Sequence, residues 1–132
     1  MVQRELFIQD ILSRAQIYRQ KIDSSSPKNL TNIMGCLLDR VCSVQSMVLS
    51  FKFLCDLLSV QCLSVIGKIQ QSDHMWNMVC INGDYYHVDA VYNATSKLNS
   101  YLNVDDRLML RDRSLSQTFS VPKAVEMKEN YF

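Results

Sequence analysis

The chain has 132 residues, 14 Lys and Arg against 13 Asp and Glu, and a formal net charge of +1. This length predicts a single domain, residues 1–132, that can bury a sizeable core. The near-neutral charge, without a basic stripe, argues against a nucleic-acid partner. Apolar runs that are interrupted by Ser, Gln, Lys and Asp argue against a membrane span.

Cysteine usage indicates free thiols rather than a disulfide framework. The count of five is odd, and the chain has only three Gly and two Pro, whereas disulfide scaffolds are usually short and have an even count. Two His and no CxxC pair argue against a metal site, and we expect no cofactor. The first residues lack the apolar core of a signal peptide, which predicts a cytoplasmic chain, or an extracellular one if it is a fragment. We expect simple core packing for four of the thiols: Cys36, Cys55, Cys62 and Cys80.

The first half of the chain predicts two helices. Apolar residues recur at helical spacing over residues 4–19, and residues 23–29 have the composition of a loop. Residues 40–59 are apolar on most faces, which is typical of a helix buried at the centre of a domain, with Asp39 as its N-cap. A short apolar run at residues 61–66 predicts a strand.

The second half predicts a β-hairpin, with Asn82-Gly83 as the turn between residues 75–81 and 85–91. We predict a further strand at residues 101–110 and an irregular tail to Phe132. Helix, strand and hairpin in this order indicate an α+β fold with an antiparallel sheet.

The turn fixes the register of the hairpin and brings two polar residues together. A two-residue loop pairs Ile81 with Asp84, and then Trp76 with Asp89. Alternate residues share a sheet face, so His74 and Asp89 become diagonal neighbours, roughly 7–8 Å apart at the backbone, within reach of a hydrogen bond. The predicted face contains His74, Trp76, Met78, Tyr85, His87, Asp89 and Val91.

A cysteine beside this pair would complete a catalytic group. Cys42 is expected in the first turn of the buried helix, where the helix dipole lowers a thiol pKa. We expect that helix to pack on the His74 face, because a Cys activated by a His that an Asp orients is the arrangement of acyl transfer. The backbone N–H of Cys42 could also stabilise an oxyanion.

Structural roles are alternatives for each of these residues. Cys42 could simply pack, His87 could be a hydrogen-bonded core or surface group, and Asp89 could be a strand-end carboxylate. Trp76 is expected in the core, although it shares the predicted site face. The run Arg111, Asp112, Arg113 is expected to be a solvated charge cluster.

Several motifs together resemble the bacterial transglutaminase-like domains of the papain-like cysteine-enzyme superfamily. The segment "MGCLLDRVCSVQSMVLSFKFLCDLLSVQCLSVIGKI" is similar to the family's Cys-led helix, LC-x-x-L helix end and strand that ends in Gly. "HMWN" resembles H-A-W-N, and "YYHVDAVYN" resembles W-Y-H-V-D-x-x-W. "YLNVDDRLMLRDRSL" and the final "NYF" resemble the segments that follow. The likeness covers roughly residues 29–132, and residues 4–19 match more loosely.

The resemblance implies a Cys-bearing central helix packed on an antiparallel sheet, with Cys42 as nucleophile, His74 as general base and Asp89 as orienting acid. It also implies a cysteine-dependent peptidase, deamidase or acyl transferase that works through a thioester on a protein or peptide substrate. Trp76 and Gln45 are candidates for substrate binding.

The chain departs from the family pattern after the expected nucleophile, where x-G-Y-A is replaced by Ser-Val-Gln-Ser at residues 43–46. The alternative is therefore a non-catalytic protein-binding module that keeps the fold.

Overall fold

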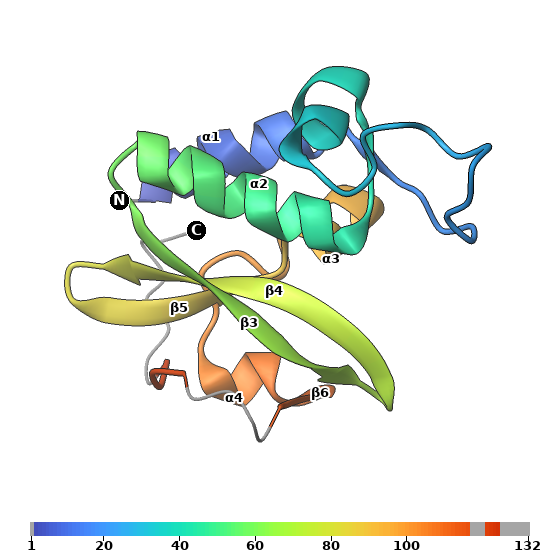
Figure 1. Ribbon diagram of the computed structural model, residues 1–132. Coiled ribbons are helices and arrows are strands. Elements are labelled where there is room, and N and C mark those ends of the chain that lie inside the picture. Colours follow the sequence, from blue (N-terminus) through green and yellow to red (C-terminus); the bar gives the residue numbers. More distant parts are fainter. Residues whose placement is uncertain (1, 117–120, 125–132) are drawn as a thin grey trace.

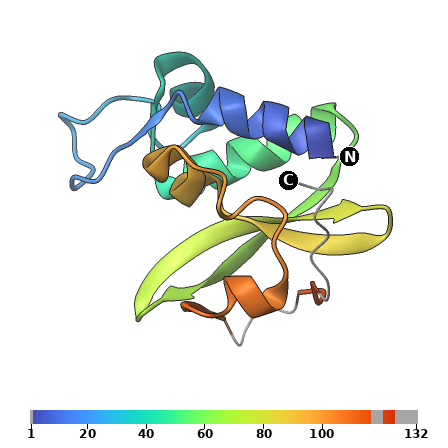
Figure 2. The ribbon, with the colours of Figure 1, turned by 180° about the vertical axis from the view of Figure 1, so that it is seen from behind.

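The structure is a computed structural model that describes residues 2–116 and 121–124. A curled antiparallel sheet of four strands, in the order β5-β4-β3-β6, forms its centre. The views from the front and from behind agree that α1, α2 and α3 lie on one side of the sheet and α4 on the other (Figures 1 and 2). The predicted α+β class with an antiparallel sheet is confirmed. The strands are β3 (Gln61–Ile69), β4 (Ser72–Ile81), β5 (Asp84–Val88) and β6 (Arg113–Leu115).

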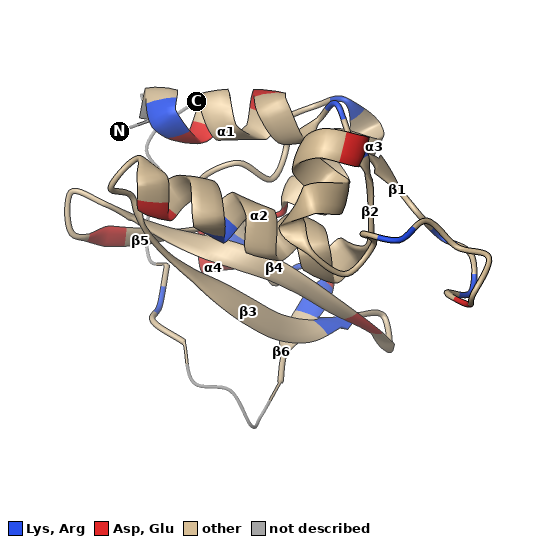
Figure 3. Ribbon diagram, turned by 45° about the horizontal axis from the view of Figure 1, so that its top comes forward, with Lys and Arg blue, Asp and Glu red and all other residues tan. Residues whose placement is uncertain are grey.

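The helices are α1 (Val2–Leu12), α2 (Val44–Leu57), α3 (Ala90–Ser96) and α4 (Asp106–Met109). A π-helical turn, η1 (Gly35–Asp39), precedes α2. Between α1 and α2 in the chain, two short strands, β1 (Gln16–Ile17) and β2 (Val41–Cys42), pair with each other in parallel. Figure 3 shows Lys and Arg interspersed with Asp and Glu along these elements. In the described residues, no helix combines the length and the apolar character needed to cross a membrane.

The predicted hairpin is confirmed at its turn. Asn82 and Gly83 have φ angles of 53° and 87°, and Ile81 pairs with Asp84 as the two-residue turn requires. The ladder stops at the pair of Asn77 with Val88, however, so the expected pairing of Trp76 with Asp89 is not formed. β5 is shorter than predicted because Asp89 already caps the next helix, α3.

Three other boundaries differ from the prediction. The helix expected at residues 4–19 ends at Leu12. The helix expected at residues 40–59 starts only at Val44, because Ser43 rather than Asp39 is the cap and its hydroxyl accepts from the Ser46 N–H at 3.2 Å. The strand expected at residues 101–110 is wrong: that segment makes a single bridge to β5 and then enters α4. The expected tail and the "NYF" motif lie mostly outside the described residues.

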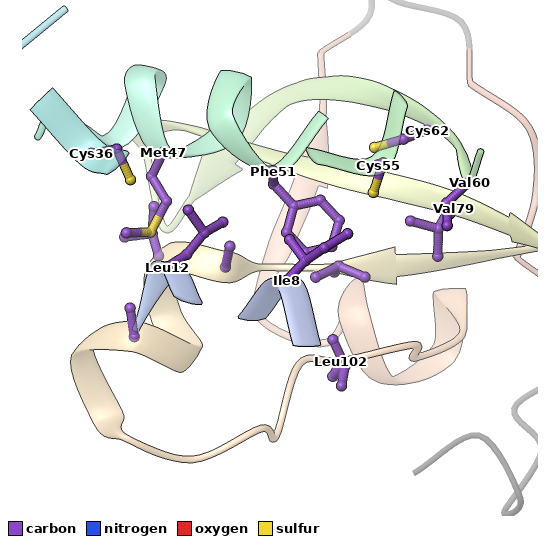
Figure 4. Close-up of a cluster of buried hydrophobic side chains, with 14 of the residues drawn as sticks. Ile8, Leu12, Cys36, Met47, Phe51, Cys55, Val60, Cys62, Val79 and Leu102 are labelled. Atoms are coloured by element: carbon purple, nitrogen blue, oxygen red, sulfur yellow. The ribbon is translucent and has the colours of Figure 1, made fainter. Parts of the chain in front are cut away.

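Buried apolar side chains form two clusters, one on each face of the sheet. The first lies between the sheet and the helices, where Phe51 of α2 and Ile8 of α1 meet Val79 of β4 (Figure 4). The second contains Trp76 and Met109, on the α4 side. We expected α2 to pack on the Trp76 face of the sheet, and this expectation is wrong. α2 packs on the face of Val79, and Trp76 lies on the opposite face because alternate residues of β4 face opposite sides.

Gly67 lets β6 approach the sheet closely. It lies opposite His74 of β4 and Leu115 of β6. A Cβ at this position would come within 2.2 Å of the Ser114 carbonyl oxygen and 2.6 Å of the Trp76 ring. Only glycine therefore allows β6 to bring its first residue, Arg113, against the site described below.

Candidate functional site

The structure brings His74 and Asp89 together. His74 lies near the start of β4, and Asp89 follows the end of β5 as the N-cap of α3. His74 Nε2 and Asp89 Oδ2 are 2.9 Å apart. β5 ends at Val88, so it does not extend between His74 and α3. The side chains of His74 and Asp89 therefore meet at the edge of β4 that β5 leaves open.

Asp89 is held as a carboxylate by three donors. Its side chain is fully buried and accepts from His74 Nε2, from Arg113 Nη1 at 2.6 Å and from the Tyr92 backbone N–H at 3.0 Å. Burial alone would raise the pKa of this carboxyl group, but the bonds and charges of His74 and Arg113 outweigh burial and lower the pKa of Asp89 below its ordinary value.

Arg113 is the residue of this site that the sequence did not indicate. Its side chain is fully buried, so the expectation of a solvated Arg111–Arg113 charge cluster is wrong for this position. The guanidinium lies between the rings of Trp76 and Tyr101, at 5.1 and 4.8 Å from their centroids. Its Nε also donates to Asp112 at 3.1 Å. Stacking and two carboxylates replace the water that an exposed arginine would have.

Cys42 is not part of this group. It is the second residue of β2, two positions before α2, and is fully buried in the cluster between the helices and the sheet. Its thiol lies within hydrogen-bonding reach of Cys36 and Ser46. The bond with Cys36 and burial raise the pKa of the Cys42 thiol, contrary to the lowering expected for a cysteine in the first turn of a helix.

Val44, and not Cys42, stands at the start of α2. It is the first residue of the helix, and it lines the same cavity as His74 and Asp89. The start of α2 thus presents an aliphatic side chain to the cavity of the His–Asp pair.

The other candidate residues lie outside the cavity. Trp76 is fully buried and donates from Nε1 to His87 Nδ1 at 3.0 Å, while Gln45 is exposed. His87 Nε2 is 2.6 Å from Asp106 Oδ1 and the side chain is fully buried, so of the two structural roles expected for His87, a hydrogen-bonded core or surface group, the structure shows the core one. Within the described part of the chain, no cluster of three His, Cys, Asp or Glu side chains could hold a metal ion.

The environment of His87 predicts a pH dependence of stability. Trp Nε1–H only donates, so Nδ1 of His87 must be unprotonated, and burial lowers the pKa of His87. The unfolded chain therefore takes up a proton near pH 6.5, before the folded chain does. We expect the free energy of unfolding to fall as the pH decreases below about 6.5, by at most about 1.4 kcal/mol per pH unit.

Urea unfolding at a series of pH values measures this dependence, and the His87→Gln variant should lose it between pH 6.5 and 5. An unchanged slope in that variant would assign the proton uptake to another group.

Asp89 contributes separately, because a lowered carboxyl pKa stabilises the fold above about pH 4 and that contribution is lost as the pH falls further.

Comparison with solved structures gives a likeness in fold. No family model and no curated protein sequence matches the chain. A solved structure described as "Crystal structure of a TGase" superposes with a TM-score of 0.55 at 10% sequence identity. The alignment covers 66% of this chain and 25% of the TGase chain. At this identity the likeness shows a shared fold alone, and this chain spans about a quarter of that protein.

Proposed function

We propose that this chain is a transglutaminase-like domain, with the core of the papain-like superfamily, that binds a protein or peptide without thiol catalysis. The likeness in fold to the TGase structure supports the first part. The second part rests on a single observation: Val44, rather than a cysteine, heads α2 and lines the cavity of His74 and Asp89.

Thiol catalysis needs the nucleophile within hydrogen-bonding reach of its base, about 2.6–3.2 Å. A valine side chain offers neither a nucleophile nor a proton to transfer. Cys42 has the required atom, but its thiol is buried beside Cys36, where the charged thiolate is disfavoured. A binding role needs none of these groups to react, because a preformed cavity with a few polar groups is sufficient.

A second candidate is a cysteine-dependent amide-acting enzyme with Cys42, His74 and Asp89 as its triad. The 2.9 Å bond between His74 and Asp89 favours this candidate, because such a bond orients the imidazole for general-base catalysis. It would require Cys42 to leave the buried cluster, turn toward His74 and form a thioester with the substrate. The residues of this candidate need no metal or organic cofactor.

Thiol labelling separates the two candidates. We expect Cys42 of the native protein to remain unmodified by iodoacetamide between pH 6 and 9 and to react only after unfolding. The physical reason is that alkylation needs an accessible thiolate. Peptide mapping by mass spectrometry gives the modified positions, and partly exposed Cys80 serves as the internal reference. Modification of native Cys42 well below pH 8.5 would reject the binding-module proposal and support the enzyme.

A further inference from the structure

The His74 cavity has a volume of about 420 Å³, which is within the usual range for small-ligand sites. Its apolar wall comes from three elements: Val44 begins α2, Ile69 ends β3, and Val91 and Tyr92 belong to α3. Most of this wall is rigid, because helices and a strand carry it. The cavity therefore offers a preformed apolar surface next to one imidazole.

Hydrogen bonding at Asp89 fixes which nitrogen of that imidazole is free. Asp89 is an ionised carboxylate and only accepts hydrogen bonds. His74 Nε2, at 2.9 Å from it, must therefore carry the proton. Neutral imidazole has one donor and one acceptor, so Nδ1 is the acceptor. The hydrogen bonds of the described residues include none to His74 Nδ1. A fully buried atom without a partner would be an orphaned acceptor, and Nδ1 is not such an atom. It is therefore accessible from the cavity that His74 lines.

The other charged groups of the cavity already have partners. Asp89 accepts from three donors, and Asp73 pairs with Lys68 at 2.8 Å. Arg19 Nη2 lies 3.5 Å from the Thr95 hydroxyl, at the edge of the cavity. The uncharged polar side chains of Gln70, Ser72 and Thr95 also line the cavity. A ligand that enters beside Val44 meets the apolar side chains there and the Nδ1 acceptor of His74, so it should carry a hydrogen-bond donor on an apolar body.

We infer that this cavity binds an aromatic side chain of a partner polypeptide that carries a single O–H or N–H donor, as a phenol or an indole does. This inference rests on the proposed binding function. Serine and threonine are too small to fill the space, and a lysine ammonium would need an unpaired carboxylate to offset its desolvation. A ring fills the apolar volume and donates to His74 Nδ1.

The surroundings of Tyr92 also favour a ring. Tyr92 already packs edge to face on Tyr101, with centroids 4.6 Å apart, and 44% of Tyr92 remains exposed. An entering ring would extend this aromatic pair, and the guanidinium of Arg19 at the edge could stack on it. Tyr101 in turn packs on Arg113, so the entering ring would be supported by side chains that are themselves fixed.

The test compares N-acetyl-tyrosinamide with N-acetyl-phenylalaninamide, which differ only in the phenolic O–H. Titrations followed by ¹H–¹⁵N NMR should give amide shifts at Val44, His74 and Tyr92. The phenol should bind about fivefold more tightly, as one net hydrogen bond provides. N-acetyl-tryptophanamide should also bind, and free p-cresol should compete for the site if the ring is the recognised part. Equal affinities for the tyrosine and phenylalanine probes, or shifts confined to other residues, would overturn the inference.

Three variants locate the effect. Val44→Phe should abolish binding by filling the cavity, and His74→Phe should remove the preference for the phenol while leaving weak binding of both probes. Phe53→Leu is the matched control, because Phe53 is an exposed ring on α2 that does not line the cavity, and it should change nothing. If Phe53→Leu abolishes the shifts, the probes bind elsewhere and the inference is wrong. Labelling of native Cys42 would instead reject the proposed function, so the two failures are distinct.

Discussion

Replacement of Arg113 by methionine should lower the free energy of unfolding by about 3–5 kcal/mol, because it leaves a buried carboxylate without its buried cation. Both side chains of the Arg113–Asp89 pair are fully buried, and their closest atoms are 2.6 Å apart. Methionine keeps an apolar stem between Trp76 and Tyr101, so the loss reflects the charge more than the packing. Urea unfolding followed by circular dichroism measures the change.

The double variant Arg113→Met with Asp89→Asn is the control for the origin of this loss. Asparagine has no charge to strand, and its side-chain oxygen can still accept from the Tyr92 N–H. We therefore expect the double variant to be more stable than the sum of the two single losses predicts. A loss below about 1 kcal/mol for Arg113→Met alone, as for an exposed ion pair, would contradict a buried pair.

The Val44→Cys variant should acquire a reactive thiol that the natural chain lacks. The introduced side chain would head α2 and line the cavity of His74. The helix N-terminus lowers a thiol pKa, and the Nδ1 acceptor of His74 could take up the thiol proton. We expect iodoacetamide to modify it with a midpoint below the free-thiol pKa of about 8.5, while Cys42 in the same molecule stays unmodified.

Leu57→Cys provides the matched reference, because Leu57 is exposed at the other end of the same helix. Its introduced thiol should titrate near the ordinary pKa. Adding His74→Phe to Val44→Cys should move the midpoint back toward that value. If the thiols at positions 44 and 57 react alike across pH, then position 44 does not face His74, and the observation behind the proposed function fails.

Local signals in the sequence predicted part of the fold and of the site. Asn82-Gly83 is a strong turn signal with a defined register, so the hairpin and the proximity of His74 and Asp89 could be predicted. The start of α2 could not, since Asp39 and Ser43 are both good caps and only the tertiary path through β2 selects Ser43. That ambiguity placed Cys42 in the helix, although the residue that heads α2 is Val44.

Long-range packing explains what the sequence did not show. The run Arg111, Asp112, Arg113 has the composition of an exposed segment, and nothing local indicates that Arg113 is covered by two aromatic rings. Its partner Asp89 is 24 residues away. A signal was available in Gly67, because a glycine inside a strand often marks close approach of another backbone, and here that backbone is β6.

The three bonds of Asp89 also link local unfolding events in different parts of the chain. Its carboxylate joins β4, β6 and the start of α3, through residues 15 and 24 positions away in sequence and one backbone amide nearby. Such a junction acts as a non-covalent cross-link, so the end of the sheet cannot detach while α3 stays capped. Amide hydrogens of β6 and of the first turn of α3 should therefore exchange with solvent through one cooperative opening, with a shared free energy and a shared response to urea.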